Sequence, residues 1–144
     1  IFMMKVTIER AGPKAFSAVS GSGHTVLMDA SAAVGGEDRG PRPMEMLLMG
    51  LGGCTSIDVV MILEKARQEI HSCKVEVTAE RADSDPKVFT RIHVHFIISG
   101  SSINPERVAR AIDLSAEKYC SASIMLGQVA DISHDFEIVE QGVN

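Results

Sequence analysis

The stretch from Pro43 to Leu63 constrains the fold more than any other part of the sequence, because only Glu45 and Asp58 in it are charged. Pro43 suits the first position of a helix, and apolar side chains follow at three- and four-residue intervals and also between them. A helix that is apolar on nearly every side must be covered on nearly every side. The sequence offers only one other substantial helical region, so we expect a homodimer in which two copies of this helix pack together.

Three glycines, Gly50, Gly52 and Gly53, precede Cys54 within this helix. Each glycine in a helix interior costs about 0.5–1 kcal/mol relative to alanine. Their use is explained if bare backbone makes room for a small substrate or an incoming sulfur beside Cys54. The same glycines also suit close packing of helices across the dimer, and a thiol on an apolar helix also suits a small buried core residue. The pattern leaves these alternatives open.

The remaining periodicities predict an α+β fold with antiparallel sheets, formed by a single domain over residues 1–144. Strands are expected at 4–10, 14–20 and 24–30, followed by an exposed loop at 35–42 that leads into the apolar helix. Two long strands are expected at 72–82 and 89–99. Asn104 and Pro105 predict the cap and first turn of a helix that runs to about Lys118. Its inward residues are expected to be Val108, Ala111, Ile112 and Ser115. Ser121 is expected to cap a further short helix before a last strand at 130–140.

The second long strand alternates between an inward and an outward face. Its inward residues are expected to be Ile92, Val94, Phe96 and Ile98, and its outward ones include Arg91, His93 and His95. The spacing of the two histidines can chelate a metal, with His71 or Cys73 as further ligands. A polar sheet face explains them more simply, and Cys73 shares an apolar strand face that indicates a core role. We therefore expect no metal and no cofactor.

Charge and composition exclude two classes of partner. The chain has 14 basic and 19 acidic residues, a net charge of -5, and no cluster of Lys or Arg that would neutralise phosphates, so nucleic acid is not expected. Uninterrupted apolar runs reach about ten residues, short of the roughly 20 that cross a bilayer, so no membrane partner is expected. Three cysteines without zinc or CxxC spacing, and no recognisable signal peptide, indicate a cytoplasmic protein.

Cys54 and Cys120 are the two cysteines with a potential redox role. Cys120 directly precedes a short predicted helix, whose amide groups would lower the pKa of its thiol. Two thiols on separate helices suit a peroxidase in which one sulfur is oxidised to a sulfenic acid and the second condenses with it. Such a bond requires the two α-carbons within about 7 Å. A core role for either cysteine remains an alternative.

The segment from Pro43 to Cys54, "PMEMLLMGLGGC", resembles the OsmC/Ohr family of osmotically inducible and organic hydroperoxide resistance proteins. The segment 118–121, "KYCS", and the pair of long strands between the two motifs extend the resemblance over essentially the whole chain. Within the family the chain is most similar to the subgroup typified by YhfA-like proteins. The resemblance implies an OsmC-like fold with a central buried cysteine-bearing helix and an intertwined homodimer with active sites at the subunit interface.

The resemblance also implies a thiol-dependent peroxidase that reduces organic hydroperoxides and is turned over by a dithiol reductant. Cys54 matches the peroxidatic cysteine and Cys120 the resolving one. Better-known members hold the thiolate with an arginine and a glutamate, whereas here Glu45 lies one place later than expected and His24 occupies the region of the arginine. His24, or Arg42 from the other subunit, would substitute as the cation. The alternative is a non-catalytic protein that binds a small apolar ligand at the dimer interface.

Overall fold

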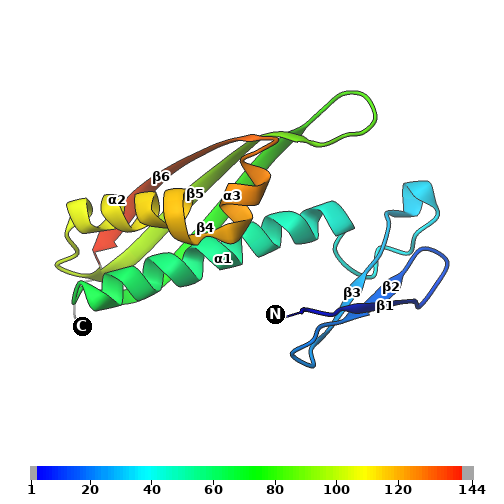
Figure 1. Ribbon diagram of the computed structural model, residues 1–144, viewed down its shortest axis with the longest axis horizontal. Coiled ribbons are helices and arrows are strands. Elements are labelled where there is room, and N and C mark those ends of the chain that lie inside the picture. The colour runs from blue at the N-terminus through cyan, green and yellow to red at the C-terminus, as the bar shows by residue number, and fades with distance from the viewer. Residues whose placement is uncertain (1–2, 141–144) are drawn as a thin grey trace. The chain divides into compact units, whose positions relative to one another are not determined.

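The computed structural model describes residues 3–140, which form two compact units. The N-terminal unit ends at Leu47 and the C-terminal unit begins at Leu48, within the long helix. The single domain expected over residues 1–144 stays a prediction, and its first two and last four residues lie outside the described part. Figure 1 shows the elements of both units.

The N-terminal unit contains an antiparallel three-stranded meander, as the sequence predicted. Its strands are β1 (Thr7–Arg10), β2 (Phe16–Val19) and β3 (Thr25–Met28), paired in the order β1-β2-β3. A short 3₁₀ turn, η1 (Ala32–Val34), follows β3. Gly23 has a φ of 88° in the β2–β3 turn, a backbone conformation that favours glycine.

Asp29, at the end of β3, organises the loop that leads to the long helix. Its side chain is buried and accepts hydrogen bonds from the backbone N–H groups of Ala30, Glu37 and Arg39, at 2.7, 3.2 and 3.2 Å. Burial raises the pKa of Asp29, but these N–H donors and the charge of Arg39 outweigh burial and leave it below the ordinary value. The loop expected to be simply exposed is therefore tied to a buried carboxylate.

The C-terminal unit contains a second three-stranded sheet with the order β4-β5-β6. β4 (Glu69–Arg81) and β5 (Phe89–Ser101) are antiparallel. β6 (Asp131–Glu140) pairs with β5 in parallel, with Ile92 opposite Ile132. The prediction of purely antiparallel sheets was therefore wrong. The reason is the helical segment between β5 and β6, which forms the long crossover that a parallel pair requires.

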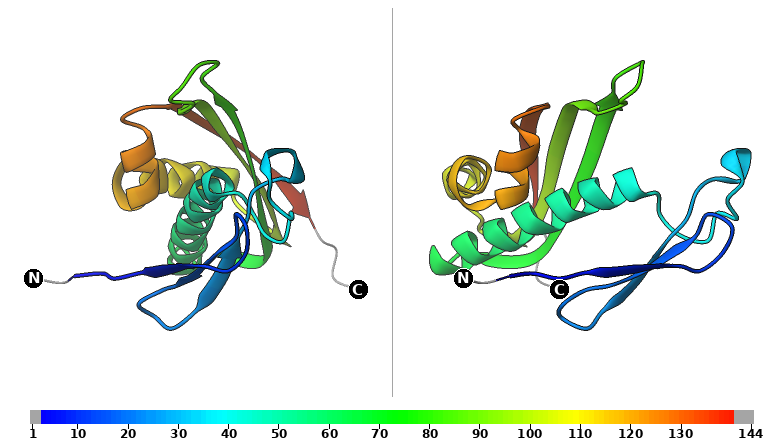
Figure 2. Two further views of the ribbon diagram at one scale, coloured as in Figure 1. Left: turned by 90° about the vertical axis from the view of Figure 1, so that its right-hand side faces the viewer. Right: turned by 45° about the vertical axis from the view of Figure 1, so that its right-hand side comes forward.

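The core of the C-terminal unit lies between this sheet and the helices on one side of it (Figure 2). The predicted inward residues of β5, Ile92, Val94, Phe96 and Ile98, are all buried. α2 (Pro105–Leu114) is capped by Asn104, whose side chain accepts from the N–H of Glu106 at 2.9 Å. α2 covers the sheet with Val108, Ala111 and Ile112, which are buried as predicted.

The long helix, α1 (Pro43–Lys65), buries only one stripe within the chain. This stripe consists of Leu51, Thr55, Val59 and Leu63, at four-residue spacing. Leu47, Met49, Ile57 and Met61 are about half exposed or more. By length and composition alone α1 could cross a bilayer. The count of uninterrupted apolar runs missed this, because glycines and charged residues interrupt the runs. The helix thus has apolar surface that residues 3–140 of one chain leave exposed.

Candidate dithiol site

α1 places Cys54 and Asp58 one helical turn apart, so both side chains project from the same face. Cys120 reaches them from the end of the second helical region. The sulfurs of Cys54 and Cys120 and a carboxylate oxygen of Asp58 all lie within 4.8 Å of one another. The predicted proximity of the two thiols, which are far apart in the sequence, is thereby confirmed. No disulfide joins them in this structure, where Cys54, Cys73 and Cys120 are all free.

A π-helical turn positions Cys120. The sequence predicts a regular helix to about Lys118, but α2 ends at Leu114 and a π turn, η2 (Ser115–Tyr119), continues it. The N–H of Cys120 donates to the carbonyl of Ser115 at 2.8 Å, which closes the wider turn. π turns inside helices are frequent at functional sites. Here the turn leaves both Ser115 and Cys120 fully buried.

Cys120 itself, and not Ser121 as predicted, caps the short helix α3 (Ser121–Leu126). Its sulfur accepts a hydrogen bond from the N–H of Ser123 at 3.3 Å. A serine hydroxyl is the usual cap, but the π turn presents the cysteine at this position. The cap fixes the direction of the Cys120 side chain.

The pKa of the Cys120 thiol is raised, opposite to the sequence-based expectation. Burial is the largest cause, because it disfavours the charged thiolate, and the hydrogen bond and charge of Cys54 act in the same direction. The hydrogen bonds from Ser123 lower the pKa but do not offset burial. The prediction counted the helix amides and missed the complete desolvation of the sulfur.

A buried hydroxyl pair links the two helical regions beside the thiols. Ser115 Oγ donates to Asp58 Oδ2 at 3.1 Å, and Thr55 Oγ1 lies 2.8 Å from Ser115 Oγ. Because the single proton of Ser115 is used on Asp58, Thr55 must donate to Ser115. The sequence analysis did not name Asp58, Thr55 or Ser115 as site residues. The signals were the four-residue spacing of Asp58 from Cys54 and the inward position predicted for Ser115.

The other predicted site residues lie in the N-terminal unit and make local contacts there. The Oε1 of Glu45 accepts from the N–H of Arg42 at 2.8 Å, which is the reciprocal half of a capping box at the start of α1. The guanidinium of Arg42 pairs with Asp38 at 2.7 Å. His24 is exposed in the β2–β3 turn, and its Nδ1 lies 3.0 Å from Ser22 Oγ. Roles for these residues at the thiols stay predictions.

The outer face of the second sheet carries the histidines that were weighed as metal ligands. His93 Nε2 and His95 Nδ1 both donate to Asp135 Oδ1, at 2.9 and 2.6 Å. The hydrogen bond to Asp135 raises the pKa of His95 and lowers that of Asp135. Cys73 pairs with Ile98 on the opposite face, so it does not join the histidines. Burial raises the pKa of Cys73, in keeping with a core role.

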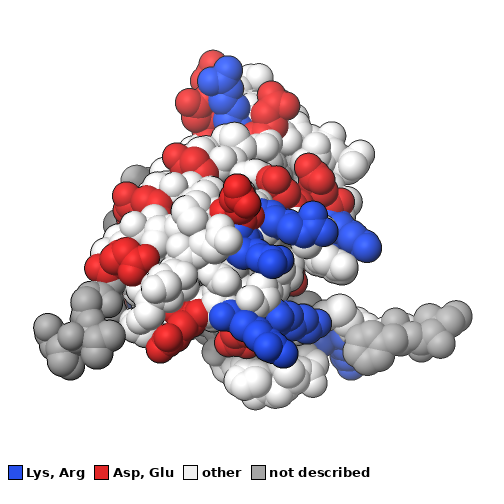
Figure 3. Space-filling model, turned by 90° about the vertical axis from the view of Figure 1, so that its left-hand side faces the viewer, with Lys and Arg blue, Asp and Glu red and all other residues white. Residues whose placement is uncertain are grey.

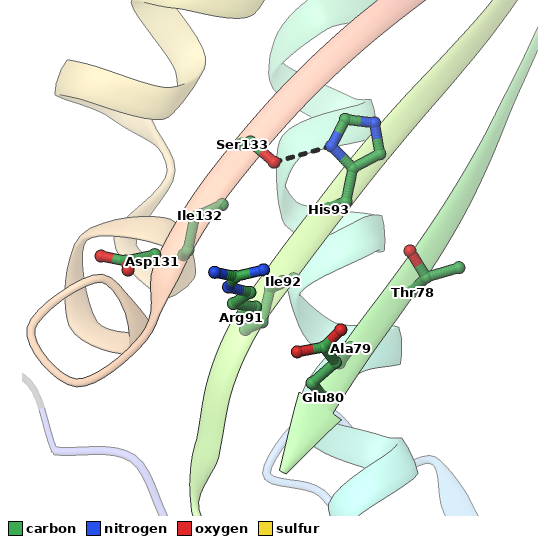
Figure 4. A pocket seen from close by; sticks show the side chains of 9 residues that line it. All are labelled: Thr78, Ala79, Glu80, Arg91, Ile92, His93, Asp131, Ile132 and Ser133. Carbon is green, nitrogen blue, oxygen red and sulfur yellow. Dashed lines mark hydrogen bonds between the residues drawn. The ribbon is translucent and has the colours of Figure 1, made fainter. Parts of the chain in front are cut away.

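An open pocket of about 480 Å³ also lies on this sheet (Figure 4). Polar side chains line it, including Glu80, Arg91 and Asp131, and Ser133 Oγ lies 2.7 Å from His93 Nδ1. Neither thiol of the dithiol site lines it. The face drawn in Figure 3 carries acidic and basic side chains close together. That face therefore shows no uniformly basic patch of the kind that binds nucleic acid.

Two small sheets, a long apolar helix and two thiols brought together from distant positions define an α+β dithiol protein. The chain belongs to the OsmC-like family, because the family model described as "OsmC-like protein" matches residues 35–135. It is 48% identical to protein YhfA of Escherichia coli K12 over 124 residues, which cover 86% of this chain and 90% of that protein.

Solved structures agree with this assignment. A hypothetical protein from Aquifex aeolicus VF5 superposes with a TM-score of 0.87 at 26% identity, covering 99% of this chain and 100% of that one. The organic hydroperoxide resistance protein OhrB of Bacillus subtilis superposes with a TM-score of 0.63 at 20% identity, covering 94% and 98%. The second likeness is one of fold alone.

Proposed function

We propose that the chain is a thiol-dependent peroxidase that reduces organic hydroperoxides through Cys54 and Cys120. The observation that carries the proposal is the approach of the two sulfurs to within 4.8 Å, although 66 positions (120 − 54) separate them in the sequence. A disulfide has an S–S distance of about 2.05 Å, so the two sulfurs must approach each other by at most about 2.8 Å to form the bond.

The reaction is a two-electron reduction of the peroxide. The thiolate of Cys54 attacks one peroxide oxygen and the O–O bond breaks, so the remaining oxygen leaves as an alkoxide and takes a proton to become the alcohol. Cys54 is then a sulfenic acid. The sulfur of Cys120 attacks it, a disulfide forms, and water leaves with the proton of the Cys120 thiol. A dithiol returns both cysteines to the reduced form by exchange.

Burial supports this division of roles between the two cysteines. Cys54 is only half-buried, which favours it as the cysteine that meets the hydroperoxide, whereas Cys120 is fully buried and its raised pKa keeps it a thiol. A reactive thiol needs a nearby cation to hold the thiolate. We propose that the imidazolium form of His24, or Arg42 from the other subunit, supplies this cation, with Glu45 as the carboxylate beside it.

The apolar surface of α1 supports the homodimer. A side chain at Gly52 would lie 3.3 Å from Val77, which gives that glycine a packing role within the chain. Cβ atoms added at Gly50 and Gly53 would meet no described atom within 4 Å other than their chain neighbours and the adjacent backbone of α1. A second copy of α1 is the partner that these two bare positions fit, and we place the reduced dimer in the cytoplasm.

Sedimentation velocity tests the dimer with paired variants. Ile57 is 63% exposed on α1 and Val129 is 66% exposed outside it. We expect Ile57→Ser to weaken association and Val129→Ser to leave it unchanged. If Ile57→Ser and the unsubstituted chain sediment equally, the proposal that α1 forms the dimer interface is wrong.

The peroxidase test treats the reduced protein with one equivalent of cumene hydroperoxide or hydrogen peroxide and maps disulfides by mass spectrometry without reductant. We expect a Cys54–Cys120 bond that forms faster with the organic oxidant, and that Cys54→Ser abolishes. Cys73→Ser is the matched control, since Cys73 lies on the sheet outside the dithiol site, and it should form the bond normally. Unchanged free thiols would instead favour a non-catalytic protein that binds a small apolar ligand at the dimer interface.

A further inference from the structure

We propose that Cys54, Asp58 and Cys120 form a Zn²⁺ site when both thiols are reduced. The three side chains offer two sulfur donors and one oxygen donor, and these atoms lie within 4.8 Å of one another. Thiolate and carboxylate groups are both ordinary Zn²⁺ ligands. The inference uses the donor geometry alone and does not depend on the peroxidase reaction.

The spacing of the donors fits a tetrahedral ion. With Zn–S bonds of about 2.3 Å and tetrahedral angles, two sulfurs on one Zn²⁺ lie about 3.8 Å apart. The observed upper limit of 4.8 Å leaves a contraction of about 1 Å or less. A change of side-chain rotamer at Cys54 or Asp58 can supply a movement of this size, because neither residue is fully buried.

The backbone holds the donors in place without the metal. Cys54 and Asp58 are four residues apart on a long helix, a spacing that puts both on one face, as in other helical metal sites. Cys120 is fixed by two hydrogen bonds, one from its N–H to the carbonyl of Ser115 and one from the N–H of Ser123 to its sulfur. The three donors come from two helical regions, so a bound ion would also cross-link those regions.

The carboxylate ligand is oriented by its own partners. Ser115 Oγ donates to Asp58 Oδ2 at 3.1 Å, which leaves the other carboxylate oxygen available to an ion. Thr55 lies 2.8 Å from Ser115 and supports that hydroxyl in turn. Hydrogen-bonded carboxylates of this kind are typical of metal sites, and loss of such a partner costs about 10–100-fold in affinity.

Three protein donors leave one tetrahedral position for water or another small ligand. Each thiol gives up its proton when it binds the metal, so binding one Zn²⁺ releases two protons and leaves the site with a net charge of about −1. Oxidation of the two cysteines to a disulfide removes both thiolate ligands. The metal-bound and disulfide forms of the site therefore exclude each other.

The test titrates the reduced full chain with Co²⁺ as a spectroscopic probe and then displaces Co²⁺ with Zn²⁺. Thiolate ligation gives intense sulfur-to-cobalt charge-transfer absorption, which a histidine site on the surface does not. We expect this absorption in the unsubstituted chain, its loss in Cys54→Ser and Cys120→Ser, and unchanged absorption in Cys73→Ser. Asp58→Asn keeps the side-chain size and should weaken Zn²⁺ binding by at least 10-fold.

Two further results decide the outcome. His95→Gln should bind Zn²⁺ as tightly at the dithiol site as the unsubstituted chain, because His95 lies on the outer sheet face. Ser115→Ala should weaken binding by about 10–100-fold. Absent charge-transfer absorption, absorption that survives Cys120→Ser, or unchanged affinity in Asp58→Asn would each overturn the proposal. This test uses no peroxide, so its outcome is independent of the peroxidase test. Metal binding can be absent while peroxide still forms the Cys54–Cys120 bond, and metal binding can be present while that bond does not form.

Discussion

A disulfide between Cys54 and Cys120 should raise the free energy of unfolding by an amount that depends on the length of the loop it closes. The bond would close a loop of 67 residues (120 − 54 + 1 = 67). Loss of loop entropy from the unfolded chain then stabilises the folded state by about 4 kcal/mol at 25 °C. Strain from drawing the sulfurs together from up to 4.8 Å reduces this gain. We expect a net increase in the free energy of unfolding of about 2–4 kcal/mol.

Urea unfolding, followed by far-UV circular dichroism because the chain has no tryptophan, measures this increase. Reduced and peroxide-treated protein are compared at one protein concentration, since association also contributes to stability. The oxidised form should have a higher midpoint and a smaller m-value, because the cross-linked unfolded chain exposes less surface. Cys120→Ser treated with peroxide is the control and should show neither change.

Two results would refute this reasoning. An oxidised midpoint equal to or below the reduced one would mean that the fold must distort to bring Cys54 and Cys120 together. A peroxide-dependent increase that survives in Cys120→Ser would mean that another thiol carries the effect. Non-reducing electrophoresis separates bonds within one chain from bonds between chains.

Three other changes test contacts elsewhere in the chain. Asn104→Ala removes the acceptor for the N–H of Glu106 and should lower the free energy of unfolding by about 1 kcal/mol in urea titration; an unchanged midpoint contradicts the capping role. Because Asp135 raises the pKa of His95, their pairing stabilises fully below about pH 6.5 and less as the pH rises through the raised value. His95→Gln should flatten the pH dependence of the thermal midpoint above that pH, and an identical profile counts against the pair. Glu45→Gln keeps a capping-box acceptor and should leave the unfolding midpoint unchanged, so a large loss of stability would show that the cap needs the charge.

Most elements of the fold could be predicted because their residues follow local rules. Val108, Ala111 and Ile112 recur at helical spacing after an asparagine cap and a proline, and they are buried where that spacing places them. Ile92 and its alternating neighbours are inward for the same kind of reason. Such patterns indicate which face of a helix or strand is apolar, and that face is the one buried in the core.

The direction of β6 and the course of the chain after Leu114 could not be predicted in this way. A strand's own alternation is the same in a parallel or an antiparallel pair, so nothing in residues 131–140 indicates that β6 runs parallel to β5. The π turn at Ser115–Tyr119 has no residue signature either. The hydroxyl pair of Thr55 and Ser115 depends on that turn, because 60 positions separate the two residues.

One consequence of the π turn concerns insertions and deletions. Each residue of an α-helix advances about 100° around the axis, so a helix without the wider turn would carry Cys120 to a different direction from the one that faces Cys54. Removal of one residue from 116–119 would let an ordinary α turn close on Ser115 and would keep Cys120 facing Cys54. An α turn of the unchanged sequence would instead separate the sulfurs. The number of residues between α2 and α3 is thus matched to the π turn, and together they determine whether the two sulfurs meet.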